Sequence, residues 1–401
     1  MAFDKIFLNA RFDDGARHHI GVKDGRIAAI MPADAPTRDD ETVDVGNALV
    51  VPGFVEGHIH LDTSFYGDAW RPHRPCTDGF NVHERVAFQA QNMAASAPMD
   101  VRARSQLDLC IGHGSTQMRS HVMVDGSVGL KSLETILRVR EEYRGLIDIQ
   151  LVAFPQSGIL ASQGTSQLLD EAIGLGANLV GGLDPASFDR DVEKHLDVVF
   201  DVANKHGIDV DIHLHDMGTL GAFEIEQIAA RTRALGMEGH VAISHAYGLG
   251  DISTDQLMTV ADTLARSGVA IMTNAPGARP FPPILALRNA GVTVFSGNDN
   301  IRDSWWPYGD GDMLRRATTL GYRSGFNTDE ELRVAFDVVT EAGAKALRLE
   351  GYGLRVGGKA DFVTLNAAHV PEAVVAVPQG RSVYKEGKLV AVNGKVVGKR
   401  A

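Results

Sequence analysis

Cysteine is scarce in this chain, which has only Cys76 and Cys110 among its 401 residues. Two cysteines are too few for a disulfide framework and are compatible with a reducing compartment. Long apolar runs are also missing, because no run approaches the roughly 20 residues that a membrane-spanning helix requires. The N-terminal stretch lacks the charged and apolar regions of a secretory signal. We therefore expect a cytoplasmic protein that does not enter a membrane.

Positively charged residues are also fewer than negatively charged ones. The chain has 39 Lys and Arg residues against 51 Asp and Glu residues, a formal net charge of −12. Such a surface repels phosphate backbones and anionic membranes, so nucleic acid is not an expected partner. The remaining composition, 44% hydrophobic and 22% charged, is typical of a globular protein and excludes a disordered or coiled-coil chain.

The two ends of the chain differ in pattern from its middle. Both ends hold short β-type runs with turn dipeptides between them, such as Asp24-Gly25, Glu386-Gly387 and Asn393-Gly394. The runs near the C-terminus include AVVAV at 373–377, which we also expect to be a strand. The ends therefore predict one small β-sandwich domain built from residues 1–50 together with 352–401.

The middle, residues 51–351, alternates apolar runs with longer stretches of helical periodicity, the pattern of parallel βα units. Eight apolar runs are present, at 48–57, 114–124, 147–156, 178–184, 209–216, 240–246, 268–276 and 291–300. Eight strands joined by crossover helices predict an α/β fold of the (β/α)₈ barrel type.

Polar side chains end several of these runs, at the edge where such a barrel places its active site. They are His58 and His60, His213 and His215, His245, and Asp299. Strand side chains alternate with period two, so the two histidines of each His-x-His pair project from the same face. An isolated pair is a weak signal, but four strand ends with imidazoles or carboxylates indicate a site for one Zn²⁺ or Fe²⁺ ion.

With these motifs the chain resembles the amidohydrolase superfamily. The stretches PGFVEGHIHLDTSF, RSHVMVD, DIHLHDMGTLGAF, SHAYGLGD and SGNDN carry the resemblance, which extends over essentially the whole length. It implies the barrel with a composite β-sandwich. Within the superfamily the chain is most similar to the cytosine-deaminase branch, and there to the subgroup that acts on s-triazine rings.

The resemblance implies that His58, His60, His213 and Asp299 bind one divalent metal ion, with Zn²⁺ preferred to Fe²⁺. Such an ion lowers the pKa of bound water from 15.7 towards about 7. Asp299 would take a proton from this water, and His245 would orient it or stabilise the developing charge. The division of these two roles stays open.

A second metal ion is not expected. Many binuclear relatives bridge two ions with a carboxylated lysine at the end of a middle strand, but no lysine occurs from 132 to 193. Gln156 and Asp184 end the two strands concerned. Gln156 matches the glutamine with which the cytosine-deaminase branch reads its substrate ring, because an amide both donates and accepts.

Weaker candidates for substrate contacts are Asn300, Asp184, Thr63 and Trp305, whose indole could stack on a flat ring. A loop asparagine, an Asx turn at Asp184 and a core tryptophan are equally compatible with the pattern. Thr63 departs from the triazine subgroup, which has a lysine there.

Cytosine deaminases carry a glutamate where this chain has Asp216, one methylene shorter, and His215 precedes it. Both residues match the triazine subgroup. They are candidate catalytic residues, with His215 the candidate acid for the departing amine. His215 could instead only support His213.

The expected activity is hydrolysis of an exocyclic C–N bond of a small cyclic amidine, on an s-triazine, pyrimidine or pterin-like ring, with release of amine or ammonia. Deamination of cytosine or a related base is the alternative. Opening of a cyclic amide and a catalytically inactive scaffold are further alternatives. The resemblance also implies a homo-oligomer, a dimer or a tetramer.

Overall fold

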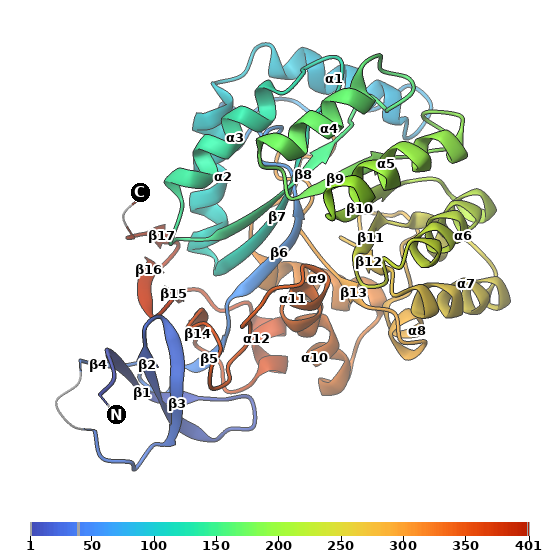
Figure 1. Ribbon diagram of the computed structural model, residues 1–401. Coiled ribbons are helices and arrows are strands. Elements are labelled where there is room, and N and C mark those ends of the chain that lie inside the picture. The colour runs from blue at the N-terminus through green and yellow to red at the C-terminus, as the bar shows by residue number, and fades with distance from the viewer. Residues whose placement is uncertain (1, 38–40, 399, 401) are drawn as a thin grey trace.

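Two β-sheets organise the chain in the computed structural model, which describes residues 2–37, 41–398 and 400. An eight-stranded sheet comes from the middle of the sequence, and a nine-stranded sheet combines strands from both chain ends (Figure 1). The first lies within a ring of helices, and the second lies beside it. This arrangement confirms the predicted α/β fold with a barrel and a small second unit.

The eight-stranded sheet is parallel and follows the chain order from its first strand to its last. Its strands are β6 (Phe54–Ile59), β7 (Ser115–Met123), β8 (Asp148–Phe154), β9 (Leu179–Leu183), β10 (Asp209–Leu214), β11 (Val241–His245), β12 (Ala270–Met272) and β13 (Val294–Phe295). Each of the eight apolar runs supplies one strand of this sheet, so the predicted barrel strands are confirmed, and the first run also holds a strand of the small sheet.

The first and last strands of this sheet meet at their C-terminal ends. The backbone N–H of Asp299 donates to the carbonyl of His58 at 2.7 Å, and that of Gly57 donates to Ser296 at 3.1 Å. Gly297 makes the approach possible, because a Cβ there would lie 2.3 Å from the backbone nitrogen of His58. The closure therefore brings the His58 and Asp299 strand ends side by side.

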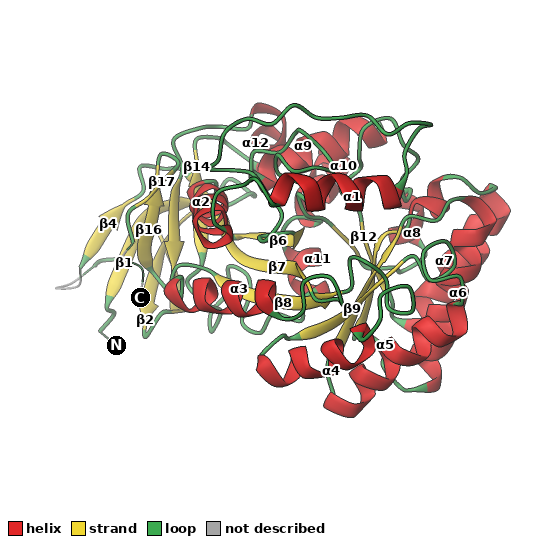
Figure 2. Cartoon of the chain, turned by 90° about the horizontal axis from the view of Figure 1, so that it is seen from above, coloured by secondary structure: helices red, strands yellow, loops and turns green. Residues whose placement is uncertain are grey.

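The helices cover the outside of the barrel (Figure 2). They are α1 (Val82–Met93), α2 (Met99–Gly112), α3 (Lys131–Glu142), α4 (Thr165–Leu175), α5 (Val192–His206), α6 (Gly218–Ala234), α7 (Thr254–Ser267), α8 (Ile284–Asn289), α9 (Met313–Ser324), α10 (Asp329–Asp337) and α11 (Glu341–Ala346), with the 3₁₀ helix η1 (Tyr247–Gly250). No helix within the described residues is long and apolar enough to cross a membrane.

Helix α7 shows why these segments are helical. Its buried side chains, Leu257, Val260, Ala261 and Leu264, recur at the spacing of one helix face. Ser253 accepts a hydrogen bond from the backbone N–H of Gln256 and so caps the first turn. Gly268 ends the helix in the left-handed conformation, at a φ of 63°.

The small sheet has the order β17-β16-β15-β14-β5-β1-β2-β3, with β4 added beside β1. Its strands are β1 (Lys5–Arg11), β2 (Arg17–Lys23), β3 (Arg26–Pro32), β4 (Thr42–Asp44), β5 (Leu49–Pro52), β14 (Phe362–Leu365), β15 (Ser382–Lys385), β16 (Lys388–Val392) and β17 (Lys395–Val396). The three dipeptides named as turns each connect two antiparallel strands.

Strands β1 and β5, where the two halves of this sheet meet, are paired through Arg11 and Leu49, and an isolated bridge joins Arg26 of β3 to Lys359 before β14. The ring of Phe7 on β1 nevertheless lies 4.9 Å from that of Tyr384 on β15, three strands away. Neighbouring strands are about 4.8 Å apart, so the sheet must fold over on itself to make this contact. The halves thus enclose a shared core, as the predicted sandwich requires, while the domain boundaries stay a prediction.

The expected strand at 373–377 is wrong, because α12 (Val370–Ala376) occupies most of this segment. His369 caps the helix by accepting from the backbone N–H of Glu372, and Pro371 lies in the first turn. Pro near the first position and a capping side chain favour a helix over the strand that its valines suggest.

Candidate active site

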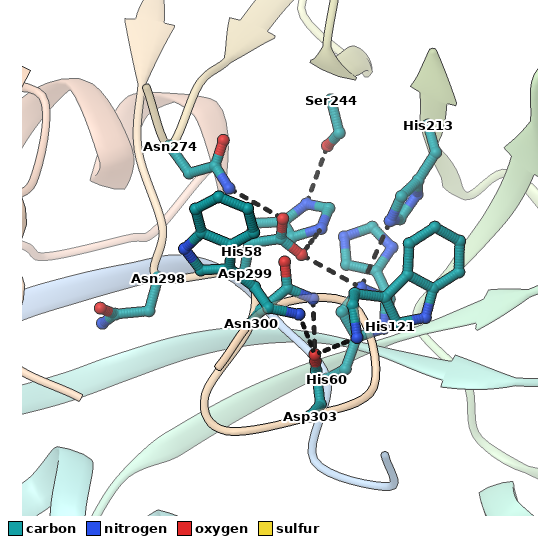
Figure 3. A network of polar contacts seen from close by, with 12 residues as sticks. His58, His60, His121, His213, Ser244, Asn274, Asn298, Asp299, Asn300 and Asp303 are labelled. Carbon is teal, nitrogen blue, oxygen red and sulfur yellow. Dashed lines mark hydrogen bonds and ion pairs between the residues drawn. The ribbon is translucent and has the colours of Figure 1, made fainter. Parts of the chain in front are cut away.

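Four side chains at the C-terminal end of the barrel direct ligand atoms to one point. His58 lies in β6 and His60 follows it, His213 lies in β10, and Asp299 follows β13. The carboxylate oxygen Oδ1 of Asp299 lies 3.6 Å from Nε2 of His58 and 3.5 Å from Nε2 of His60. Nε2 of His213 lies 3.4 Å from Nε2 of His60 (Figure 3). The structure thus brings the four predicted metal ligands together.

These atoms fit a metal ion rather than a hydrogen-bonded cluster. Nε2 of His58 is buried and has no hydrogen-bond partner among the residues that the structure describes. Three imidazoles and one carboxylate are the donor set of a zinc or iron site. Buried nitrogen and oxygen lone pairs that face one another without a donor are unfavourable unless a cation satisfies them. The residues present therefore fit one divalent ion.

A chain of polar contacts fixes the ring of His58. Ser244 on β11 donates its hydroxyl proton to Asp211 on β10 at 2.7 Å, and its oxygen lies 2.9 Å from Nδ1 of His58. With its proton committed to Asp211, the serine oxygen accepts from Nδ1–H, which leaves the Nε2 lone pair for a cation. Arg119 neutralises Asp211 from 3.0 Å.

The charge states of Asp299 and His213 also suit a cation. Burial works to raise the pKa of Asp299, but the neighbouring His245, His58 and His60 outweigh it and hold that pKa well below its ordinary value. Burial lowers the pKa of His213 well below its ordinary value. A carboxylate and a neutral imidazole are the forms that bind metal. Asn274, after β12, donates to the second oxygen of Asp299 at 2.8 Å (Figure 3).

The backbone at two of these strand ends is left-handed. His245 has a φ of 75° and Asp299 a φ of 61°. Such values are uncommon for residues with a side chain and cluster where a structure positions functional groups. The turns direct both side chains towards His58, whose ring centroid is 5.0 Å from that of His245.

Flat side chains form one wall above the cluster. The ring of His215 is stacked on His245 at 4.6 Å with an interplanar angle of 20°, and it is nearly parallel to Trp305 at 6.3 Å. Nδ1 of His215 lies 2.9 Å from a carboxylate oxygen of Asp184, so its Nε2 is the nitrogen left for a ligand. Trp305 is held by α1, because its indole N–H donates to Gln89 at 2.6 Å.

The cluster and this wall enclose a cavity of about 1190 Å³. Of the predicted substrate contacts, Gln156, Thr63, Asn300 and Trp305 line it. The loop before α1 contributes Phe80 to its mouth. Asn300 also donates to Asp303 at 2.8 Å, which orients its amide.

Asp184 and Asp216 are not among the residues that line the cavity. Asp184 lies behind His215, whose ring it orients. Asp216 turns the other way, accepting from the backbone N–H of Ser187 at 3.2 Å and sharing a hydrogen bond with Glu224 on α6. Burial, then the Asp216 charge, raises the pKa of Glu224 to about 9, so Glu224 carries the shared proton. The structure does not bring Asp216 to the other predicted catalytic residues.

Three contributing residues were not named from the sequence. Asp211, Ser244 and Asn274 support His58 and Asp299 in the contacts above. Asp211 had a signal, because it interrupts an apolar strand two residues before His213 and so shares its face. Ser244 and Asn274 follow no comparable pattern.

A (β/α)₈ barrel with a buried histidine and aspartate cluster at its strand ends defines a class, the barrel enzymes that work with a metal centre. The comparison with protein families is more specific. The model of the amidohydrolase family matches residues 41–397. The chain belongs to this family, as its motifs predicted, and it is a hydrolase that acts on C–N bonds.

Three of the proteins similar to this chain align with nearly its whole length. An N-isopropylammelide isopropyl amidohydrolase from Pseudomonas sp. (strain ADP) is 32% identical, with 98% of this chain and 99% of the relative covered. The crystal structure of N-isopropylammelide isopropylaminohydrolase from Burkholderia multivorans is 39% identical, covers 98% of this chain and 99% of its own, and has a TM-score of 0.93. The 5-methylcytosine deaminase from Klebsiella pneumoniae with 5-fluorocytosine is 28% identical, covers 96% and 97%, and has a TM-score of 0.84.

Proposed function

We propose that this chain is a metal-dependent aminohydrolase that replaces an amino or N-alkylamino group on a cyclic amidine with oxygen. The rings we propose are s-triazine, pyrimidine or pterin-like. The observation that carries the proposal is the convergence of four ligand atoms at the floor of a cavity lined by Gln156 and by the flat wall of His215 and Trp305. The protein would thus hold a flat ring beside activated water.

The proposed ligands are His58, His60, His213 and Asp299, with Zn²⁺ preferred to Fe²⁺. A divalent ion bound there polarises water and makes a nucleophile available at neutral pH. The protein's own part is to keep the donor atoms in place. Ser244 and Asp211 hold the Nδ1 proton of His58, and Asn274 holds one oxygen of Asp299.

Two pairs of residues are placed to move protons. Asp299 is ionised and lies beside His245, so together they can take up the proton of the attacking water and stabilise the charge that develops on the ring. On the wall, Asp184 accepts the Nδ1 proton of His215. His215 in its protonated form can then donate from Nε2 to the departing amine.

An N-alkylamine is the leaving group that we favour over ammonia. A cavity of about 1190 Å³ has room for a substituted ring. Two similar proteins are named for the removal of isopropylamine from N-isopropylammelide. Asp216 lies outside the cavity, so the work of the glutamate in cytosine deaminases falls to His215 in this proposal.

Deamination of cytosine or a related base is the second candidate, favoured by the similarity to the 5-methylcytosine deaminase. Opening of a cyclic amide is disfavoured, because the ends of β8 and β9 carry no lysine to bridge a second ion. A homo-oligomer, dimer or tetramer, and a cytoplasmic location stay predictions of the sequence.

The test is mass spectrometry of products after incubation of zinc- or iron-loaded protein with cytosine, pterins, ammelide and N-alkylated ammelides. Release of alkylamine supports the proposed removal of an N-alkylamine. Release of ammonia alone supports the alternative of a deaminase. His215→Gln should slow the loss of amine about 100-fold while metal content stays at one ion per chain. Asp216→Asn is the matched control at the neighbouring position, with turnover within about threefold of the parent. A lack of turnover of every ring would contradict the proposed substrate class.

A further inference from the structure

Positive side chains are concentrated in the cavity, although the chain as a whole has a net charge of −12. Two carboxylates line the cavity, Asp299 and Asp310. The lining also includes six arginines: Arg85, Arg279, Arg302, Arg315, Arg316 and Arg323. The cavity is therefore an electropositive region within an acidic protein.

Most of these guanidinium groups have partners in the protein. Arg85 donates to Ser304, Arg316 to the carbonyls of Asn274 and Asn298, and Arg323 to those of Pro276 and Arg279. Arg315 pairs with Asp310 at 2.6 Å. These groups brace loops or balance a charge, so they do not call for a ligand.

Arg279 differs from them. Among the described residues, no carboxylate oxygen lies within 4.0 Å of its guanidinium, and no side-chain hydrogen bond from it is present. The group is half-buried in the cavity wall, with its Cζ 3.4 Å from the ring centroid of Phe80 and 5.7 Å from that of Tyr247. Tyr247 in turn lies 5.4 Å from His245, so Arg279 is near the reaction site.

Stacking of this kind prepares a guanidinium for one class of ligand. Phe80 covers a face of the cation and restrains its plane, while the N–H donors at its edge stay available. Parallel N–H donors in a plane match two acceptor atoms in a plane, as in a carboxylate or a deprotonated ring amide. Partial burial strengthens such a pair relative to one in water.

We propose that Arg279 binds a planar oxyanion edge of the substrate, so that this enzyme selects anionic rings, or rings with an anionic substituent, over neutral ones. This inference rests on the proposed function, since it names the substrate of that same cavity. Two parts of a substrate can supply this planar oxyanion edge: the O–C–N edge of an acidic ring, or a carboxylate on the N-substituent. Arg302, exposed at the rim over Tyr66, would add to the attraction.

The first experiment is calorimetric titration of the metal-loaded protein with barbiturate and with uracil. Both are flat rings without an amino group to hydrolyse, but only barbiturate is anionic at neutral pH. With the ring edge as the source, Arg279→Gln weakens barbiturate binding about 10- to 100-fold and changes uracil binding less than about threefold. Arg279→Lys, which keeps the charge without the paired donors, recovers part of the loss. Arg266→Gln, which removes an exposed arginine far from the cavity, changes neither.

The second experiment distinguishes the other source. It compares an ammelide whose exocyclic nitrogen carries a carboxymethyl group with its neutral isopropyl counterpart, by KM where the compounds are hydrolysed and by calorimetric titration where they are not. If the substituent is the source, Arg279→Gln raises KM or Kd for the carboxymethyl compound about 10- to 100-fold, with barbiturate binding unchanged.

The proposal is overturned if Arg279→Gln weakens anionic and neutral ligands equally, because Arg279 then only packs the wall through Phe80. It is also overturned if no ligand is weakened more than about threefold. Calorimetry needs no turnover, so an enzyme that hydrolyses none of these rings still reports on Arg279. The failure of this inference is therefore separable from failure of the proposed activity.

Discussion

The floor of the cavity, which is the cluster of His58, His60, His213 and Asp299 with its supporting residues, is built differently from the upper wall. The floor consists of strand ends, and its side chains hold one another through contacts such as Asp211 with Ser244 and Asn274 with Asp299. The upper wall, formed by Phe80, Arg279 and Tyr308, consists of loops. Phe80 and Tyr308 are exposed, and Arg279 has no acidic partner among the residues that the structure describes. This difference is what our proposals require, in which the floor performs the hydrolysis and the upper wall selects the substrate.

The largest effect should come from breaking the floor. We expect Asp299→Ala to lower turnover at least about 1000-fold and to lose bound metal, because it removes the ionised side chain that we propose as a metal ligand, worth several kcal/mol of charge stabilisation. Metal analysis and initial rates measure both effects, while circular dichroism checks that the fold is kept. Asp310→Ala, which removes a carboxylate from the upper cavity, is the control and should keep its metal. A variant of Asp299 with normal rates would contradict the role of the floor.

A smaller effect, on metal affinity, should follow when a residue that supports the floor is removed and the proposed ligands are kept. Ser244→Ala leaves His58 in place but removes the acceptor of its Nδ1 proton. The loss of such a supporting contact costs about 10- to 100-fold in metal affinity. Competition with a chelator measures that affinity. Equal affinity in the two proteins would show that His58 needs no support.

The hydrogen-bonded pair of Asp216 and Glu224, which lies outside the cavity, should affect stability rather than catalysis. The folded-state pKa of Glu224, about 9, lies above its ordinary 4.5. The folded protein therefore holds a proton that the unfolded chain releases, and the free energy of unfolding falls as pH rises from about 4.5 to about 9. One such proton changes stability by up to about 1.4 kcal/mol per pH unit.

Urea denaturation of the metal-loaded protein at pH 6 and pH 8 measures this dependence. Glu224→Gln should flatten it, because glutamine is neutral throughout. The control is Glu226→Gln, an exposed position on the same helix, which should keep the parental slope. An unchanged slope in Glu224→Gln would show that Asp216 and Glu224 share no proton.

The smallest effect is expected at the outer rim. Tyr308 is 70% exposed, so Tyr308→Ala should change the free energy of unfolding by less than about 0.5 kcal/mol. We expect kcat to be unchanged and KM to change less than about threefold, as steady-state kinetics would measure. A large fall in kcat would mean that the rim takes part in chemistry and would erase the contrast with the floor.

Much of the floor could be predicted because its signals are local. His58 and His60 of the floor, like His213 and the wall residue His215, are two residues apart at a strand end, and this spacing predicts that each pair shares a face. Parallel strands in a barrel bring their C-terminal ends together, so Asp299 joins His58 although 241 residues of sequence separate them. The missing lysine between 132 and 193 likewise favoured a single metal ion without any structure.

The directions of Asp216 and of the side chains in the upper wall were decided by tertiary structure. Asp216 directly follows His215, yet it turns away from the cavity because Ser187 and Glu224 offer its carboxylate hydrogen bonds on the other side. Arg279 comes from a loop without periodic pattern, and its guanidinium is placed by packing against Phe80 and Tyr247, which come from distant segments. The sequence by itself thus determined which strand ends meet, because the backbone geometry of parallel barrel strands brings their C-terminal ends together. The direction of each loop side chain depends on neighbours far away along the chain, and only the folded protein specifies those.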